Sequence, residues 1–364
     1  MKKFLYRPAD LKEFMVEFLK KLNVPVGDAE IAANILLEAD LRGVDSHGII
    51  RLNSYYGNRL RAGMIDPSTS FQVLQETPSS LSIDCANGLG QVVSFKTMQR
   101  CIEKAKTANI CMATVRNSNH YGIAGYYAMM ALPDDMIGIS FTNSQPLVAP
   151  THGRTAVLGS NPIAVAVPCG TQQPFVLDMA TSIVPIGRIA VFEKSGKLIP
   201  EGWGIDRQGV VTNDPTAVSH GGALLPLGGI DEMRGYKGYG LALLVDIFCG
   251  VLAGASFGSN VGLPQDLSRT TDIGHFFAAI RIDAFRPLDD FKRDMDHLLT
   301  MIKESPKALG EDRIYIHGEK EFDTAARNAK AGIPLSANVI DSLIKDAFEI
   351  GIEFIAEPVG EIET

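Results

Sequence analysis

Residues 71–284 constrain the fold most, because short apolar runs alternate there with turn-forming residues. The runs are rich in β-branched side chains and are separated by Gly, Pro, Asn and Ser, a pattern typical of strands. They lie at residues 81–84, 110–115, 136–142, 163–167, 175–177 and 276–282. Two segments with helical spacing, 92–106 and 240–252, interrupt them. The pattern predicts an α/β fold with a mixed central sheet flanked by helices.

Both ends of the chain have helical rather than strand-like spacing. Apolar residues recur every three or four positions over 11–22, and the segment 28–41 has the same character. Helical spacing returns after residue 289, at 291–303, 319–331 and 337–350. We therefore expect a discontinuous helical domain of residues 1–75 with 287–364, in which both chain ends form one helical layer, and an α/β domain of residues 76–286.

The charge balance limits the partners that the chain can bind. The formal net charge is -8, whereas nucleic acids and anionic membranes attract clustered positive charge. The longest apolar run, 240–255, contains Asp246 and is shorter than the roughly 20 residues that span a bilayer. We expect a buried helix there, and neither nucleic acid nor a membrane as a partner.

Cysteine usage and the first residues favour a cytoplasmic protein. The five cysteines form no Cys-x-x-Cys pair and no regular framework, so neither a zinc site nor a disulfide is predicted. Residues 4–6 are the only apolar run before Arg7, which is too short for the core of a signal peptide. A reducing cytoplasm fits these features, and no metal is predicted.

The segment Asp45-Ser46-His47-Gly48, which continues to Arg51 and Tyr55, is the strongest candidate for a site. The preceding helical pattern breaks before it, so Ser46 is predicted to be the N-cap of a new helix. His47, Arg51 and Tyr55 would then lie four residues apart on one face. A guanidinium fork near a helix N-terminus suits a carboxylate. The alternative is a polar surface helix on which these residues align by accident.

Two glycine-rich segments could bind a nucleotide phosphate. Gly88-Leu89-Gly90 follows a predicted strand, but the third glycine of a dinucleotide fingerprint is replaced by Val93, and no acidic ribose anchor follows. The segment 235–240 is the better candidate, because its glycines permit close approach and Lys237 adds charge at a helix start. The alternative for this segment is a glycine-lined helix packed against the sheet.

Four predicted strands border similar polar loops, at residues 117–120, 143–146, 159–162 and 178–182. Sites in α/β proteins are commonly assembled from such loops, so the four could converge. His47 and His120 both stand between a turn and a helix, and imidazole suits proton transfer at neutral pH. As alternatives, Asn and Ser are ordinary turn residues and such a histidine can be structural.

Taken together, these segments resemble the malate/L-lactate dehydrogenase family, which includes malate, sulfolactate and ureidoglycolate dehydrogenases and ketimine reductases. The resemblance covers almost the whole chain and is closest to the malate dehydrogenase members. The supporting strings are Asp45-Ser46-His47-Gly48, Asn117-Ser118-Asn119-His120-Tyr121-Gly122, Gly159-Ser160-Asn161-Pro162, Asp178-Met179-Ala180-Thr181-Ser182, Pro200-Glu201-Gly202-Trp203 and Tyr236-Lys237-Gly238-Tyr239-Gly240.

The resemblance implies a non-Rossmann nicotinamide-binding fold, in which residues 76–286 bind cofactor and substrate, and a homodimer with active sites near the subunit boundary. The cofactor would be NAD, with NADP as the alternative. By similarity, His120 is the proton acceptor, and His47, which lies beside it with Ser46, is a second catalytic residue with acid-base work in some relatives. Ser46, Arg51 and Tyr55 are the implied substrate contacts. The implied cofactor contacts are Ser144, Asp178, Met179, Ala180, Lys237, Gly318 and Glu319.

The predicted function is hydride transfer between NAD(P) and a small 2-hydroxy acid or 2-oxo acid, with malate and oxaloacetate as the first pair. Gln145 replaces an acidic residue of the ureidoglycolate enzymes, and His317 replaces a proline. Other acids of the family, and imines, are the alternatives. A metal-dependent hydrolase with His47, His120 and Asp178 as ligands lacks supporting ligand spacing, and a noncatalytic binding protein is the third alternative. The sequence does not decide which histidine accepts the proton.

Overall fold

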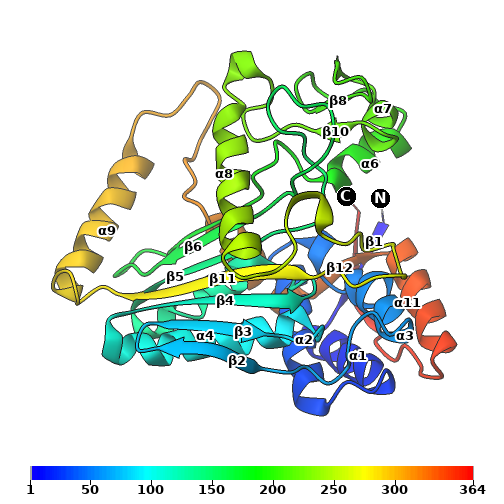
Figure 1. Cartoon of the computed structure of the whole chain (residues 1–364), viewed down its shortest axis with the longest axis horizontal. Helices are drawn as coiled ribbons and strands as arrows, with labels where there is room; N and C mark the ends of the chain where they lie inside the picture. The colour runs from blue at the N-terminus through cyan, green and yellow to red at the C-terminus, as the bar shows by residue number, and fades with distance from the viewer. Residues whose placement is uncertain (1, 364) are drawn as a thin grey trace.

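A seven-stranded mixed sheet lies at the centre of the molecule (Figure 1). The computed structural model describes residues 2–363. The strand order is β2-β3-β4-β11-β5-β6-β7. The strands are β2 (Gln72–Thr77), β3 (Ser80–Asp84), β4 (Ile110–Ser118), β5 (Met136–Thr142), β6 (Ile163–Val167), β7 (Phe175–Met179) and β11 (Ile273–Arg281). The predicted α/β class with a mixed sheet is confirmed.

The strand directions bring the predicted polar loops to one edge of this sheet. Only β3 and β4 are parallel, and every other neighbouring pair is antiparallel. Consequently β4, β5 and β7 end at the same edge at which β6 and β11 begin. The loops at 117–120, 143–146, 159–162 and 178–182 border that edge, as the sequence predicts.

Helices cover both faces of the sheet, because alternate side chains of each strand point to opposite faces. Phe277 belongs to the core under α4 (Gly90–Ala108) and α5 (Ala124–Met129), and the neighbouring Phe276 to the core under α8 (Tyr236–Asp246). A π-helical turn, Ile247–Val251, continues α8. Figure 1 shows α8 and α4 on opposite sides of the sheet.

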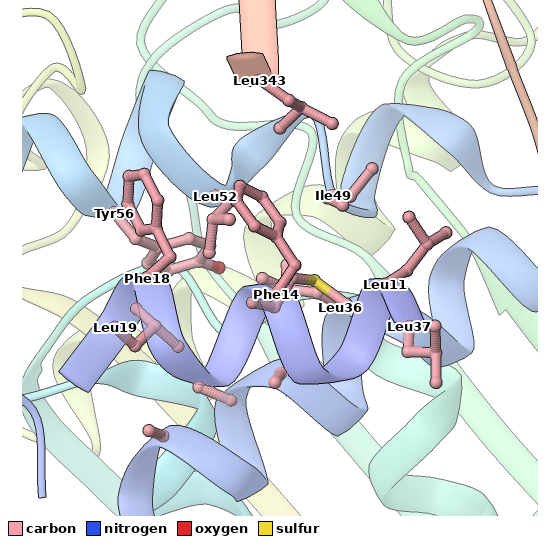
Figure 2. Packing of buried hydrophobic residues seen from close by; sticks show 14 of the residues in the cluster. Leu11, Phe14, Phe18, Leu19, Leu36, Leu37, Ile49, Leu52, Tyr56 and Leu343 are labelled. Atoms are coloured by element: carbon pink, nitrogen blue, oxygen red, sulfur yellow. The ribbon is translucent and has the colours of Figure 1, made fainter. Parts of the chain in front are cut away.

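Both chain ends build a second core beside the sheet. It contains α1 (Pro8–Lys21), α2 (Val26–Leu41) and α11 (Ala337–Glu349). Figure 2 shows Phe14 and Phe18 of α1 packed against Leu52, Tyr56 and the side chain of Leu343 from α11. Each such apolar side chain contributes about 1.5–3 kcal/mol when fully buried. This core is the predicted helical layer from both chain ends.

A small sheet ties the two ends together, which the sequence analysis did not predict. Its strands are β12 (Ile333–Ser336), β1 (Lys2–Tyr6) and β13 (Pro358–Glu363), in that order, and both neighbouring pairs are antiparallel. The α10 helix (Glu319–Ala331) lies against α2, where Asn328 donates to the carbonyl oxygen of Leu41 at 3.0 Å.

The remaining elements contribute little to these cores, apart from Leu60 of α3, which is buried in the core of the helical layer. The α9 helix (Leu288–Glu304) stands away from α1 and α11 (Figure 1), although its residues fall in the predicted helical domain, so the predicted domain division stays a prediction. No helix within residues 2–363 is long and apolar enough to cross a membrane. The other elements are α3 (Asn58–Arg61), α6 (Ile186–Lys194), α7 (Pro215–Ser219), β8 (Gly204–Ile205), β9 (Val211–Thr212) and β10 (Ala223–Leu224).

Candidate active site

The turn around Ser46 departs from the predicted helix. Residues Asp45–His47 form one 3-10 turn, Gly48 has an extended conformation, and helical structure resumes only at Arg51. The prediction that Ser46 is an N-cap is therefore wrong, and its hydroxyl lies instead 2.9 Å from Nδ1 of His47. His47, Arg51 and Tyr55 consequently do not share the face of one regular helix.

Asp40 explains this irregular turn. Its buried carboxylate, near the end of α2, accepts the backbone N–H of Ile49 at 2.7 Å. A Cβ atom on Gly48 would overlap that carboxyl group, so only glycine fits there. Burial raises the pKa of Asp40 to about 8 despite the hydrogen bond from Ile49. The carboxyl group of Asp40 thus replaces the hydroxyl of Ser46 as the group that fixes the turn.

A π-helix at Leu52–Gly57 then directs two adjacent tyrosines toward His120. The hydroxyl of Tyr55 accepts the backbone N–H of His120 at 3.2 Å, and the hydroxyl of Tyr56 lies 2.7 Å from its Nδ1. Single π-helical turns occur frequently at functional sites. The imidazole of His47 stacks on that of His120, with ring centroids 5.3 Å apart. The fold therefore brings together both predicted histidines and Tyr55.

Arg51 lies beside this histidine pair with part of its guanidinium available. Its Nε donates to the carbonyl oxygen of Ser46 at 2.7 Å, which fixes the side chain in the turn. The charge of Arg51 contributes to the lowered pKa of both His47 and His120. The two terminal nitrogens of the fork have no hydrogen-bond partner among residues 2–363, and two parallel donors of this kind match a carboxylate.

Both histidines are neutral at neutral pH. Desolvation by the surrounding protein, with a smaller contribution from Arg51, lowers the pKa of His47 to about 4. Desolvation, followed by the nearby His47 and Arg51, lowers the pKa of His120 well below 6.5. Both rings nevertheless keep some solvent-accessible surface. Neutral imidazoles in an accessible recess can exchange a proton with a bound ligand.

The Gly88-Leu89-Gly90 segment has a structural role in holding the His120 loop. A Cβ atom on Gly90 would collide with the carbonyl oxygen of Asn119, so the start of α4 approaches that loop closely. The side chain of Asn119 donates to the carbonyl oxygen of Gly88 at 2.9 Å and accepts the hydroxyl of Thr271 at the same distance. These contacts explain why glycines occupy this segment, although their pattern resembles a phosphate-binding motif.

The similarities to known proteins agree with this geometry. A family model described as malate/L-lactate dehydrogenase matches residues 6–344. The chain belongs to this family. A malate dehydrogenase of Pyrococcus abyssi is 47% identical over 94% of each chain, and an L-sulfolactate dehydrogenase of Methanocaldococcus jannaschii is 39% identical over 96% of this chain and 98% of the relative. The solved structure of malate dehydrogenase from Pyrococcus horikoshii OT3 is 44% identical, with a TM-score of 0.89 and coverage of 96% of this chain and 97% of that one.

As a member of this family, the protein is an oxidoreductase of the 2-hydroxy acid dehydrogenase type, and the relatives imply a nicotinamide cofactor. The predicted family and enzyme class are therefore confirmed. Within residues 2–363, no group of His, Cys, Asp and Glu side chains has the arrangement of a metal site. The hydrolase alternative consequently has no ligand set in the described part of the chain.

Several predicted cofactor contacts border the sheet edge near the histidines. The hydroxyl of Ser144 accepts the backbone N–H of Ser160 at 3.0 Å, and the backbone N–H of Thr181 donates to the carbonyl oxygen of Ser160 at 2.8 Å. Met179 ends β7, and the half-buried Ala180 connects it to Thr181. Polar and backbone groups from three loops are therefore adjacent along this edge.

Asp178 connects the sheet edge to the helix that follows His120. Its carboxylate accepts the backbone N–H of Gly125 at 2.7 Å, at the start of α5. The side chain is open to solvent, yet the protein packed around it raises the pKa of the carboxyl group to about 6. Asp178 is also close enough to Tyr121 to raise the pKa of that phenol. Asp178 is therefore one of the structural links between the candidate cofactor contacts and the His120 loop.

Gly318 and Glu319 reach the same region from the other end of the chain. Gly318 has a φ of +95°, and a Cβ atom there would lie 3.0 Å from the Cβ of Val176 on β7. The buried carboxylate of Glu319 binds Nζ of Lys303 at 2.6 Å and a guanidinium nitrogen of Arg313 at 3.2 Å. Glu319 thus fixes the turn through its ion pairs, which occupy the carboxylate.

Lys237 lies at the start of α8, where its side chain is exposed. A Cβ atom on the next residue, Gly238, would overlap the backbone of Leu227, and the N–H of Leu227 donates to the carbonyl oxygen of Thr181 at 2.8 Å. The structure therefore supports both alternatives for the segment 235–240. Its glycines permit close packing, and Lys237 leaves a free ammonium group near the polar loops.

Sequence reasoning missed three residues of this site. Tyr56 adjoins the predicted Tyr55, but only a π-helix lets both reach His120. Gln91 is fully buried and close enough to Tyr56 to lower the pKa of its phenol, although within residues 2–363 neither polar atom of the Gln91 side chain reaches normal hydrogen-bond geometry. Asp40 is the third. Residues 28–41 contain four acidic side chains, so the local pattern did not single out Asp40.

Proposed function

We propose that the enzyme interconverts a small 2-hydroxy acid and its 2-oxo acid, with malate and oxaloacetate as the first pair. One observation carries this proposal. Within residues 2–363, the two terminal nitrogens of the Arg51 guanidinium have no partner, and they lie beside two stacked, neutral imidazoles. A fork binds the carboxylate that all these acids share, and an imidazole exchanges the proton of the hydroxyl group. The malate dehydrogenase relatives support the choice of malate.

Substrate binding is proposed to centre on Arg51, with Ser46 and Tyr55 beside it. Arg51 approaches the acid from the irregular turn, where Nε is already fixed by the carbonyl oxygen of Ser46. The fork is therefore oriented before the acid arrives, which reduces the entropy lost on binding. Tyr55 contacts the His120 backbone and so links the carboxylate site to the proton-exchange site.

His120 is proposed to exchange the proton of the hydroxyl group. The His120 ring is held at Nδ1 by the buried hydroxyl of Tyr56 and by the backbone N–H of Gly122. The ring of His47 is held only by the hydroxyl of the exposed Ser46 among the contacts described. A firmly oriented base is the better proton acceptor, because general-base catalysis depends on geometry as well as on pKa. His47 is proposed to line the same recess and to keep water from the far side of the His120 ring.

NAD is the proposed cofactor, with NADP as the alternative. Two features suit a dinucleotide: the exposed ammonium of Lys237 at the start of an 11-residue helix, and the Cβ-free turn at Gly318. The remaining proposed contacts are Ser144, Asp178, Met179, Ala180 and the turn at Gly318 that the ion pairs of Glu319 fix. When bound, the nicotinamide ring supplies hydride acceptance and donation. Fluorescence titration with each reduced cofactor would give the preference.

A homodimer is proposed from the apolar face of α8 and of the turn that continues it to Leu252. Leu241, Leu244, Ile247, Val251 and Leu252 are between 38% and 61% exposed. A contiguous apolar face of this kind is uncommon on a monomer. A second copy of the chain is the proposed occupant. Sedimentation should give twice the mass of the chain, and a double change of Leu244 and Ile247 to Asp should give the monomer. A monomeric native protein would contradict the proposal.

A panel of 2-oxo acids assayed with NADH and with NADPH tests the proposed reaction. Oxaloacetate should give the highest kcat/KM, with sulfopyruvate and pyruvate as comparisons. If another 2-oxo acid is preferred, the Arg51 site stands and the assignment of malate fails. If neither a 2-oxo acid nor an imine oxidises either reduced cofactor while both cofactors bind, the noncatalytic alternative is correct.

A further inference from the structure

Tyr56 lies behind His120, within the core of the helical layer. It is fully buried, and Figure 2 shows its ring next to Phe18 and Leu52. Its hydroxyl oxygen is 2.7 Å from Nδ1 of His120 and 3.3 Å from the carbonyl oxygen of the same residue. A buried hydroxyl with two partners on one histidine can control the orientation of that ring.

The backbone of Gly122 determines which nitrogen of the resting His120 carries the proton. Its N–H points at Nδ1 from 3.2 Å, and a backbone N–H can only donate. Nδ1 is therefore an acceptor, so a neutral ring carries its proton on Nε2. The hydroxyl of Tyr56 donates to the same Nδ1 atom, at the shorter distance of 2.7 Å. The nitrogen that faces away from Tyr56 is then an N–H donor.

We propose that Tyr56 is the positioning residue for His120, and that its hydroxyl orients the ring and serves as partner to Nδ1 in both neutral tautomers. This inference rests on the proposed proton exchange at His120. In the resting form, Nε2–H can donate a hydrogen bond to the carbonyl oxygen of a 2-oxo acid. Transfer of that proton requires a second ring proton on Nδ1, so that a neutral ring with Nδ1–H remains afterwards. A carboxylate holds the histidine in many acid-base pairs, whereas here the partner is a phenol.

A phenol suits a reversible reaction because it can donate or accept. For Nε2 to take the hydroxyl proton of a 2-hydroxy acid, the proton of the ring must first be on Nδ1. In this tautomer the N–H of Gly122 loses Nδ1 as its acceptor, which is why the resting ring keeps its proton on Nε2. Tyr56 offsets that loss, since its oxygen can accept from Nδ1–H while its own proton turns to the carbonyl oxygen of His120, 3.3 Å away. The substrate proton then moves to Nε2, and Tyr56 loses no proton.

Gln91 provides a second observation. Its side chain is buried beside Tyr56, and among the residues that the structure describes neither of its polar atoms has a partner at normal hydrogen-bond geometry. Buried polar groups are nearly always hydrogen-bonded, so an unpartnered amide next to a hydroxyl marks a place where the hydroxyl can turn. Gln91 also lowers the pKa of the Tyr56 phenol, so its amide is close enough to exchange a hydrogen bond with that hydroxyl.

The variant Y56F removes the hydroxyl and keeps the ring in the core. We expect kcat to fall about 10- to 100-fold in both directions, the range for loss of one hydrogen bond to a charged or reacting group. KM and cofactor affinity should change little, because Tyr56 does not face the substrate. The matched control is Y126F, which removes a hydroxyl that accepts from Asn34 on α2, and its kcat should stay at the wild-type value. A kcat of Y56F within about threefold of wild type would overturn the inference.

The 15N signals of the histidine rings test the tautomer in the wild-type protein. The His120 signals are assigned by their loss in H120N. They should show a protonated Nε2 and an unprotonated, hydrogen-bonded Nδ1 at neutral pH, and the Nδ1 signal should move in Y56F. A protonated Nδ1 in the resting protein would overturn the inference even if Y56F does not fold. The NMR measurement needs no turnover. A wrong tautomer would therefore contradict only this inference, whereas absence of dehydrogenase activity would contradict the proposed function.

Discussion

The imidazole rings of His47 and His120 stack with their centroids 5.3 Å apart and their planes at 27°. The charged form of one ring would repel the charged form of the other, and His47 is among the causes of the lowered pKa of His120. The pair can therefore hold one proton more easily than two. A site of this kind is suited to exchanging a single proton with a ligand held by Arg51.

Replacing Arg51 by Lys should weaken substrate binding. An ammonium group cannot reproduce two parallel donors, so KM for the oxo acid should rise about 10- to 100-fold. Steady-state kinetics at saturating cofactor measures the effect. Arg61→Lys is the matched control, because Arg61 donates to Asn53 and Asn58 on the same stretch of chain. An unchanged KM in R51K would place the carboxylate site elsewhere.

For oxidation of the 2-hydroxy acid, in which a histidine acts as the base, the pH dependence of kcat/KM should lack the usual histidine transition. A histidine in water loses its charge near its ordinary pKa of 6.5. Desolvation lowers the pKa of His47 to about 4 and the pKa of His120 well below 6.5. As the pH falls through 6.5, the free enzyme therefore keeps both neutral rings, and kcat/KM stays nearly constant. Initial rates in buffers of constant ionic strength measure this. A fall centred near pH 6.5 would show that the rings titrate as exposed groups do.

Replacing Asp40 by Asn should stabilise the protein at alkaline pH. The pKa of Asp40 rises from 3.8 when unfolded to about 8 when folded, so between these values the folded state binds one more proton. The free energy of unfolding then decreases as pH rises, by up to about 1.4 kcal/mol per pH unit, and levels off above about 8. The amide oxygen of Asn can still accept the N–H of Ile49.

Urea unfolding of D40N and wild type at about pH 5 and about pH 8 measures this difference. The advantage of D40N should be larger at the higher pH. An advantage that is equal at both values would show that the carboxyl of Asp40 does not change its protonation over this range.

Replacing Gly90 by Ala should damage both stability and turnover. A Cβ atom would collide with the carbonyl oxygen of Asn119 and displace the His120 loop. We expect a loss of about 1–3 kcal/mol, the usual result of forcing atoms into a packed region, together with a lower kcat. Gly27, in α2, has no atom within 4 Å of its Cβ position. Gly27→Ala is thus a control that should be neutral or slightly stabilising, and equal thermal unfolding of the two variants would contradict the packing argument.

Regular elements were predictable because their apolar spacing directly reports burial. The predicted bounds of β5 at 136–142 and of α10 at 319–331 match the structure. The predicted strand ends also located the polar loops, because each of these loops directly follows or precedes a strand. These signals depend on residues close together in the sequence.

The irregular parts could not be predicted, because they depend on contacts distant in sequence. The turn at Gly48 is set by Asp40 from the preceding helix, so the local pattern at Ser46 indicated a helix that does not form. The π-helix that directs Tyr55 and Tyr56 toward His120 has more residues per turn than an α-helix, so other residues share one helix face than the α-helical spacing predicts. The ion pairs of Glu319 with Lys303 and Arg313 likewise join separate segments, and the predicted cofactor contact at Glu319 stays a prediction.

The turnover of H120N tests the central claim, that His47, Arg51 and His120 form the reaction site. The variant should lower kcat by about 10²- to 10⁴-fold, the usual contribution of a positioned general acid or base, and should leave the Kd of the reduced cofactor unchanged. H47N, measured in the same way, should lose less. If H120N keeps nearly full turnover with every 2-oxo acid that the wild type reduces, the proposed site is wrong.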